Sequence, residues 1–173
     1  DANLDNSDKF GRSVSLDSDG DRLAVTTSED DGNGGSNSNA GAVHLFTFDD
    51  TNFSNPTHVG TIGVGYSGTK SLDIGSGATN DLLDNNDQFA NSLALTKDGK
   101  ILAVSAQQDD GSGVDDGTNA GAVYLFEFTN SDFEGISHAG TIGIGYSDSE
   151  KKADYDTTSI SDWGTGQLAI DGD

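Results

Sequence analysis

Apolar and polar residues alternate in short segments along most of this chain. In "GAVYLFEF", at residues 121–128, the small and aromatic residues share one face of an extended segment, and Val123, Leu125 and Glu127 share the other. Both faces are largely apolar, which is typical of a strand that lies between two layers. Similar segments rich in β-branched and aromatic residues recur between clusters of Gly, Asp and Asn, and no window shows a helical period. The pattern therefore predicts an all-β protein.

The chain also repeats itself, with an offset of 79 residues that becomes 80 after one insertion. The matching stretches are "LDNSDKFGRSVSL" (4–16) with "LDNNDQFANSLAL" (83–95), "NAGAVHLFTF" (39–48) with "NAGAVYLFEF" (119–128), and "HVGTIGVGYS" (58–67) with "HAGTIGIGYS" (138–147). A fixed period of this kind is the signature of a repeat architecture. It predicts one unit over residues 1–82, a second over 83–158 and the start of a third over 159–173, where Trp163 stands in the place of Phe10 and Phe89.

Each full unit contains four predicted strands. They are 10–16, 21–28, 41–48 and 58–66 in the first unit, and 89–95, 100–107, 121–128 and 138–146 in the second. Small sheets that are apolar on both faces bury them by stacking on neighbouring units. We therefore predict four-stranded antiparallel repeats of about 80 residues that resemble β-propeller blades. Phe10 and Phe89, which begin the two units, are expected in the core because aromatic side chains contribute most to one.

Composition excludes several classes of function. The 173 residues carry a formal net charge of −22, which opposes binding to nucleic acid, and they include no cysteine for disulfides, thiolate catalysis or Cys-based zinc sites. No apolar run approaches the length of a membrane span, so no membrane insertion is expected. The Gly-x-Gly in "GTIGVGY" lacks the following helix of a dinucleotide site, and no nucleophile motif is present. The chain is therefore not expected to be an enzyme.

The stretch between the second and third strands is acidic in both units. It reads "SEDDGNGGSNSNAG" in the first unit and "QQDDGSGVDDGTNAG" in the second. Carboxylate and amide oxygens in a glycine-rich loop can supply the 6–8 oxygen ligands that Ca²⁺ takes, whereas Mg²⁺ prefers phosphates and retained waters. The candidate ligands are Asp30, Asp31, Asn33, Asp109, Asp110, Asp115 and Asp116. The alternative is a solvated loop in which Asp and Asn side chains hydrogen-bond to their own backbone.

A second acidic stretch, "DSDGD" at residues 17–21, invites the same interpretation. The repeat argues against it, because the equivalent stretch "TKDGK" has lysine at two of the five positions. What both copies share is Asp-Gly, a hairpin-turn signature. We therefore predict a tight turn at this position.

The order of these elements resembles the FG-GAP type of repeat in its bacterial form. The shared elements are Asp-x-Phe-Gly-x-Ser, then Leu-Ala-Val, then an Asp-Asp-Gly loop, then Gly-Ala-Val-aromatic-x-Phe. The resemblance implies propeller blades, as in the integrin α-subunit head, and large proteins that bacteria secrete or attach to their surface. The second unit departs from the pattern at Ala90, where the Phe-Gly pair has lost its glycine.

We therefore expect a structural or adhesive segment (a filament, stalk or adhesin head) of an extracellular or cell-surface bacterial protein, with calcium in its acidic loops. The alternative is a carbohydrate- or protein-ligand-binding propeller module. The expected partners are neighbouring repeat units of the same or identical chains, and a cell-surface glycan or protein. Because propellers typically have 4–8 blades, two units call for a longer array or for several chains.

Overall fold

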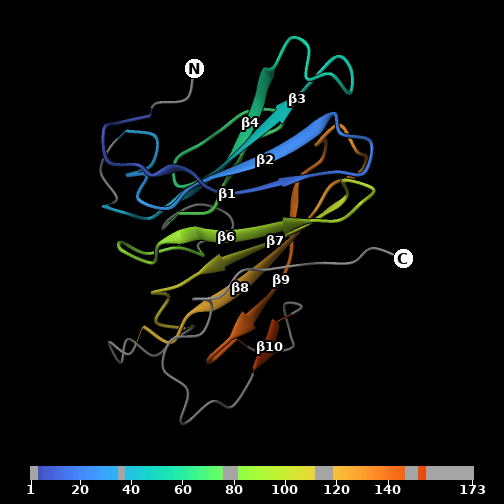
Figure 1. The fold of residues 1–173 in the computed structure, drawn as a ribbon. Coiled ribbons are helices and arrows are strands. Elements are labelled where there is room, and N and C mark those ends of the chain that lie inside the picture. The colour runs from blue at the N-terminus through green and yellow to red at the C-terminus, as the bar shows by residue number, and fades with distance from the viewer. Residues whose placement is uncertain (1–3, 35–37, 76–81, 112–118, 147–151, 155–173) are drawn as a thin grey trace.

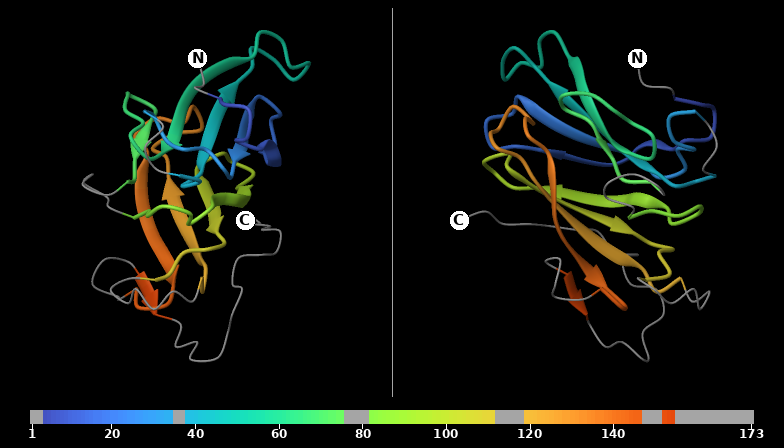
Figure 2. Two further views of the ribbon diagram at one scale, coloured as in Figure 1. Left: turned by 90° about the vertical axis from the view of Figure 1, so that its left-hand side faces the viewer. Right: turned by 180° about the vertical axis from the view of Figure 1, so that it is seen from behind.

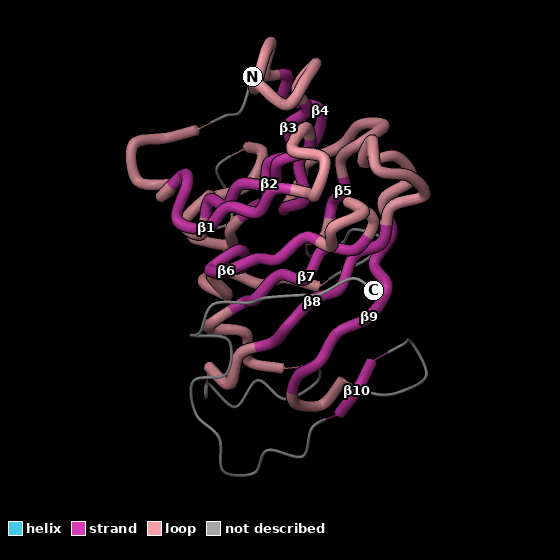
Figure 3. The backbone as a smooth tube through the Cα atoms, turned by 45° about the vertical axis from the view of Figure 1, so that its right-hand side comes forward, coloured by secondary structure: helices cyan, strands magenta, loops and turns pink. Residues whose placement is uncertain are grey.

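The computed structural model describes residues 4–34, 38–75, 82–111, 119–146 and 152–154, and over these residues the protein contains strands and no helix (Figures 1 and 3). The strands form two sheets, one for each repeat unit, which confirms the predicted all-β class. Unit 1 contains β1 (Phe10–Leu16), β2 (Arg22–Thr27), β3 (Ala42–Thr47), β4 (Thr57–Gly63) and β5 (Leu72–Asp73). Unit 2 contains β6 (Phe89–Leu95), β7 (Ile101–Ala106), β8 (Ala122–Glu127), β9 (Ser137–Gly143) and β10 (Lys152–Asp154).

The first four strands of each sheet form an antiparallel meander, in the order that the repeat predicts. The structure adds a fifth strand to each sheet, β5 or β10, which pairs in parallel with the fourth. These strands have two and three residues. The prediction of four strands missed them because so short a segment shows no alternation of apolar and polar residues.

The Phe-Gly pair that opens each unit lies at a bulge in the first strand. The register between β1 and β2 shifts after Phe10, and Gly11 has a φ of 84°. In unit 2 the register shifts in the same way after Phe89, and Ala90 adopts a φ of 65°. An alanine in this left-handed region costs about 1 kcal/mol relative to glycine. Unit 2 therefore keeps the bulge although it has lost the glycine that suits it.

The two sheets pack against each other, with β1 and β6 side by side at the junction (Figures 1 and 2). We call the face that carries Phe10, Val14 and Leu16 the front face of unit 1; the front face of unit 2 carries the equivalent residues Phe89, Leu93 and Leu95. The opposite, back faces carry Ala24, Val43, Leu45 and Ile62 in unit 1, and Ala103, Val123, Leu125 and Ile142 in unit 2.

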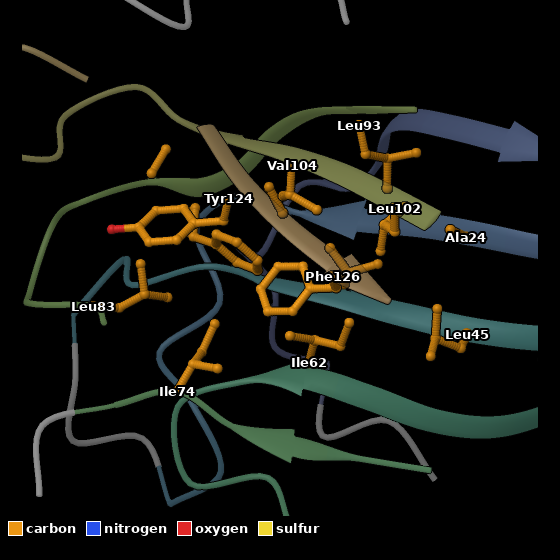
Figure 4. Packing of buried hydrophobic residues seen from close by; sticks show 14 of the residues in the cluster. Ala24, Leu45, Ile62, Ile74, Leu83, Leu93, Leu102, Val104, Tyr124 and Phe126 are labelled. Atoms are coloured by element: carbon orange, nitrogen blue, oxygen red, sulfur yellow. The ribbon is translucent and has the colours of Figure 1, made fainter. Parts of the chain in front are cut away.

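The hydrophobic core lies between the back face of unit 1 and the front face of unit 2. Figure 4 shows Ile62 of unit 1 beside Phe126 of unit 2, with Leu45 of unit 1 and with Leu93 and Tyr124 of unit 2 in the same cluster. All five side chains are buried. The prediction from the apolar pattern is thus confirmed on one face of each third strand: unit 2 covers the back face of β3, and unit 1 covers the front face of β8. The ring of Phe10 packs on the front face of β3, and the back face of β8 stays partly exposed. The core of this protein is therefore an interface between repeats.

The expected third unit, with Trp163, lies outside the described residues. The last strand of the first sheet, β5, ends at Asp73, and the first strand of the second sheet, β6, begins at Phe89.

Candidate functional site

Each acidic loop is anchored by one buried aspartate that follows the second strand. Asp30 accepts hydrogen bonds from the backbone N–H of Gly32 at 2.8 Å and from the hydroxyl of Tyr66 at 3.0 Å. Tyr66 follows β4, where Gly65 turns the chain with a φ of 75° and ends the strand earlier than predicted. The carboxylate therefore ties the acidic loop to the end of the fourth strand.

Asp109 occupies the same place in unit 2. It accepts hydrogen bonds from the N–H of Gly111 at 2.8 Å, from the hydroxyl of Tyr146 at 3.1 Å and from the hydroxyl of Tyr124. Burial raises the pKa of Asp109, and it raises the pKa of Asp30 in the same way. The pKa of both tyrosines rises as well, first through burial and then through the neighbouring carboxylate. These groups form a buried polar network that closes the loop.

The second aspartate of each Asp-Asp-Gly holds the far end of the loop. Asp31 accepts a hydrogen bond from the backbone N–H of Asn39 at 2.7 Å, and Asp110 accepts one from Asn119 at 2.9 Å. Asn33 donates its side-chain amide to the carbonyl of Gly65 at 3.2 Å. Short aspartate-to-backbone bonds of this kind are what a self-satisfied turn uses.

Two further aspartates join these loops, and sequence reasoning did not single them out. Asp8 and Asp87 precede the first strands and are buried. The pKa of Asp8 is raised by burial and by the nearby charges of Asp5 and Asp31. Burial and the charge of Asp109 raise the pKa of Asp87 to about 8. The signal was present in the sequence, because "NSDKF" and "NNDQF" keep this aspartate in both units.

The predicted calcium ligands are thus brought together only in part. Asp30, Asp31 and Asn33 share one loop, Asp109 and Asp110 share the other, and Asp115 and Asp116 lie outside the described residues. Within the described part of the chain, no group of three or more acidic or histidine side chains converges in a geometry that could hold a metal ion. The carboxylates of Asp30 and Asp109 point instead at protein donors. Calcium binding by these loops stays a prediction.

The "DSDGD" stretch is the tight turn that the repeat predicts. One carboxylate oxygen of Asp17 accepts hydrogen bonds from the backbone N–H groups of Gly20, Asp21 and Arg22. In unit 2, Asp98 accepts from the N–H of Lys100 at 3.1 Å and so serves the same turn.

A histidine replaces the buried tyrosine in unit 1. His44, at the position of Tyr124, is fully buried, and its Nε2 lies 3.9 Å from Asp30 without a hydrogen bond. Its Nδ1 lies 3.2 Å from the hydroxyl of Thr61 and 3.4 Å from Nε2 of His58. Burial lowers the pKa of His44 to about 4, so the ring is neutral at physiological pH. Unit 1 therefore lacks one of the hydrogen bonds that close the loop of unit 2.

Polar contacts surround the apolar junction between the units. The hydroxyls of Ser13 and Ser15 on β1 accept hydrogen bonds from the backbone N–H groups of Leu93 and Leu95 on β6, at 3.4 and 3.0 Å. At one end, Arg22 donates to the carbonyl of Ser131 at 3.0 Å and to the carboxylate of Asp132. Lys70 donates to the carbonyl of Asp132 at 2.7 Å.

The most informative feature is the set of apolar side chains that stays exposed. Six large hydrophobic residues of the described chain are exposed: Leu4, Phe10, Val14, Leu16, Phe53 and Ile101. The first five lie in unit 1, and their equivalents in unit 2 are buried: Leu83, Phe89, Leu93, Leu95 and Phe133. The clearest pair is Phe10, with 47% of its surface exposed, and Phe89, with 0%. The expectation that both rings are buried in the core is therefore correct for Phe89 and wrong for Phe10, whose front face no other described unit covers.

The fold and its junction define a class of protein: an all-β repeat protein whose blade-like sheets stack front to back. Comparison with protein families agrees. The family of FG-GAP repeats matches residues 2–46 and 83–126, which is just over half of the chain, and the matches end within β3 and β8. The chain belongs to the FG-GAP repeat family. No curated protein is similar enough to this chain to be matched.

Membership of this family indicates which kinds of function to consider. FG-GAP repeats are found in extracellular adhesion and integrin-like proteins, and they are structural or binding modules rather than catalytic ones. Among the described residues, no helix is long and apolar enough to cross a membrane.

Proposed function

We propose that this chain is a structural repeat segment of an extracellular or cell-surface bacterial protein, in which FG-GAP units stack front to back into a filament, a stalk or an adhesin head. The observation that carries the proposal is the junction between the two units. Its apolar core is continuous, and Phe89, Phe126 and Leu45 are fully buried within it. A segment that bears load between neighbouring units needs a junction that is as well packed as a domain core.

The stacking predicts that the two units unfold together. Leu45 of unit 1 is fully buried on the face that meets unit 2, and its equivalent Leu125 is only partly buried on the back face of unit 2. Leu45→Ala is expected to cost about 2–5 kcal/mol and Leu125→Ala distinctly less, because only a well-enclosed site leaves a cavity.

Hydrogen exchange measured by mass spectrometry tests the coupling. In Leu45→Ala, amides of β7 and β8 in unit 2 should lose protection by the same factor as amides of β2 and β3 in unit 1. The matched control is Leu125→Ala, with a smaller effect. If Leu45→Ala changes protection in unit 1 alone, the units are independent and the stacking role has no basis. Protease treatment of intact cells, followed by detection of the chain, tests the surface location.

We further propose that calcium stiffens the acidic loops. The support is electrostatic: burial and then neighbouring carboxylates raise the pKa of Asp8 and Asp30 in unit 1 and of Asp87 and Asp109 in unit 2, and the neighbours include Asp31 and Asp110. A bound divalent cation would offset this repulsion, and oxygen-rich loops suit Ca²⁺.

Thermal unfolding in calcium and in EDTA tests this proposal. A ligand that binds only the folded state at a hundred times its Kd adds about 2.7 kcal/mol of stability. Asp110→Asn should reduce the calcium effect, and the control Asp19→Asn, with the same change of charge in an exposed turn, should leave it intact. An equal Tm in calcium and EDTA would refute calcium binding without touching the stacking role.

A further inference from the structure

We propose that the front face of unit 1 binds the back face of unit 2 of a second copy of this chain, with the geometry of the internal junction. The inference rests on the proposed stacking and adds the identity of one partner. Such a contact joins two different surfaces of the molecule, so it is head-to-tail and leads to a ring or an open filament.

The template for this contact is the junction inside the chain. There the back face of unit 1 covers Phe89, Leu93 and Leu95 completely. The front face of unit 1 presents Phe10, Val14 and Leu16 at the same positions, and each of them is exposed.

The surface that would cover this front face is also present in the chain. On the back face of unit 2, Val123, Leu125 and Ile142 are only partly buried, whereas Val43, Leu45 and Ile62 in unit 1 are fully buried. The close approach of backbones is possible as well. A Cβ on Gly41 would lie 2.0 Å from the carbonyl oxygen of Phe89, so this position must be glycine, and unit 2 keeps it as Gly121.

The residues at the edge of the interface, which we call its rim, favour a second copy of this chain as the partner. Inside the chain, the rim pairs Arg22 with Asp132. The equivalents are Ile101 in unit 2 and Asn52 in unit 1, so neither charge is present at a contact between copies. Ile101 is exposed, and so is Phe53, which follows Asn52. Docked like the internal junction, Ile101 would meet the turn that carries Phe53, and an ion pair would be replaced by an apolar contact.

Charge near this rim is also complementary. Lys100 directly precedes Ile101, whereas unit 1 has Asp21 at that position. The turn before Phe53 contains Asp49 and Asp50, whereas unit 2 has Thr129 and Asn130 there. A lysine at this end of the unit 2 sheet would thus approach two aspartates in the turn of unit 1. The internal junction has the same polarity, with the cation Arg22 on unit 1 facing the carboxylate of Asp132 on unit 2.

Two features make the contact between copies weaker than the internal one. Ala94 stands in the place of Ser15, so one hydroxyl that caps a backbone N–H at the internal junction is lost. Each copy carries a net charge of −22, so the copies repel each other over a range of about 10 Å at 0.1 M salt. We therefore expect association that appears at high protein concentration and strengthens as salt is added.

Sedimentation velocity over a range of protein and NaCl concentrations tests the proposal, with EDTA present throughout so that bound calcium plays no part. The wild-type chain should form species larger than a dimer. Val14→Asp blocks the front face, and Ile101→Asp blocks the back face. Each substitution replaces an exposed side chain, so the fold should survive, which circular dichroism checks. Each variant alone should associate at least about tenfold more weakly.

Mixing the two blocked variants provides the decisive measurement. Val14→Asp leaves the back face of unit 2 unchanged, and Ile101→Asp leaves the front face of unit 1 unchanged. These two faces can still bind each other, so the mixture should form a one-to-one dimer that grows no further. Both partners carry the same added charge, so recovery in the mixture shows that electrostatic repulsion was not what stopped each variant. Phe53→Asp serves as a second front-face variant with the same expected behaviour.

Three results would overturn the proposal. They are a wild-type chain that stays monomeric at every concentration and salt level, association that neither variant weakens, and blocked variants that do not pair when mixed. None of these results bears on the internal junction, which the exchange experiment on Leu45→Ala tests within a single chain. A failure of self-association and a failure of the stacking role are therefore distinguishable.

Discussion

The same substitution at the two equivalent phenylalanines measures the contribution of a neighbouring unit. Phe10 and Phe89 open equivalent strands, and each ring packs edge-on against the third strand of its own sheet, Phe10 on Phe46 and Phe89 on Phe126. They differ in what lies on the other side. Phe89 is enclosed by the back face of unit 1, whereas nearly half of the Phe10 surface is exposed. Alanine substitution at each position therefore separates the contacts within a unit from those between units.

The expected magnitudes follow from these exposures. Phe89→Ala removes a fully buried ring and leaves a cavity, which costs about 3–5 kcal/mol. Phe10→Ala removes a ring that is about half buried and leaves no enclosed cavity, so about 1 kcal/mol is expected. The difference of roughly 2–4 kcal/mol is the contribution of the junction at this position, and it corresponds to a factor of 30 or more in the folding equilibrium by the usual conversion of about 1.4 kcal/mol per tenfold.

Urea unfolding followed by far-UV circular dichroism gives both free energies. The protein should be dilute, because any head-to-tail association would stabilise the front face and make Phe10→Ala more costly at high concentration. The slope of free energy against urea should be equal in the three proteins, so that the midpoints report stability alone. Equal losses for Phe10→Ala and Phe89→Ala would refute the reasoning, since the neighbouring unit would then contribute nothing at this site.

Three further predictions concern buried charges and the junction, all measured in EDTA. Burial raises the pKa of Asp87 to about 8, so the unfolded chain releases this proton near pH 4 and the folded chain does not. The contribution of Asp87 to stability should therefore fall between about pH 4 and pH 8, by up to about 1.4 kcal/mol per pH unit, and the difference in stability between wild type and Asp87→Asn measures it. Burial lowers the pKa of His44 to about 4. The contribution of His44 has the opposite sign: it is lost as pH falls from about 6.5 to about 4, and His44→Tyr should remove this contribution and supply a hydroxyl to Asp30. Arg22→Ala should cost about 1–2 kcal/mol and Asp132→Ala less than about 1, because the guanidinium also bonds a carbonyl whereas the carboxylate is half exposed.

Urea titrations at a series of pH values check the first two predictions, with each variant serving as the control for the other. A difference in stability between wild type and Asp87→Asn that does not fall between pH 4 and pH 8 would contradict the assignment of Asp87. A difference in stability between wild type and His44→Tyr that stays constant between pH 4 and pH 6.5 would place that proton on another group. Equal losses of stability in Arg22→Ala and Asp132→Ala would mean that the ion pair, and not the hydrogen bond to the carbonyl of Ser131, holds the two units together at this edge of the junction.

Much of the local structure follows from the sequence because alternation and repetition are local signals. The bounds of β1 and β6 are as predicted, and a second layer covers one of the two apolar faces of β3 and of β8, as their pattern indicated. The internal repeat also decided between a turn and a metal loop at Asp17, because the second copy keeps only the Asp-Gly pair. The family likewise follows from motifs that lie within the first three strands of each unit.

The side-chain partners of the aspartates in the acidic loops could not be predicted from the sequence. Composition indicated that Asp30 and Asp109 carry chemistry, but it could not show that tyrosines from beyond the fourth strand would take up their carboxylates. It also left out Asp8 and Asp87, which come from a different part of the chain and approach the loops only in the folded protein.

The sequence by itself determined the first four strands of each unit and their order, because these depend on neighbours in the chain. Only the tertiary structure decided which of two nearly identical faces is buried. Phe10 and Phe89 stand in the same local pattern, yet one is exposed and the other enclosed. The physical reason is that hydrophobic burial depends on which surface lies opposite, and in a stacked repeat that surface belongs to the next unit.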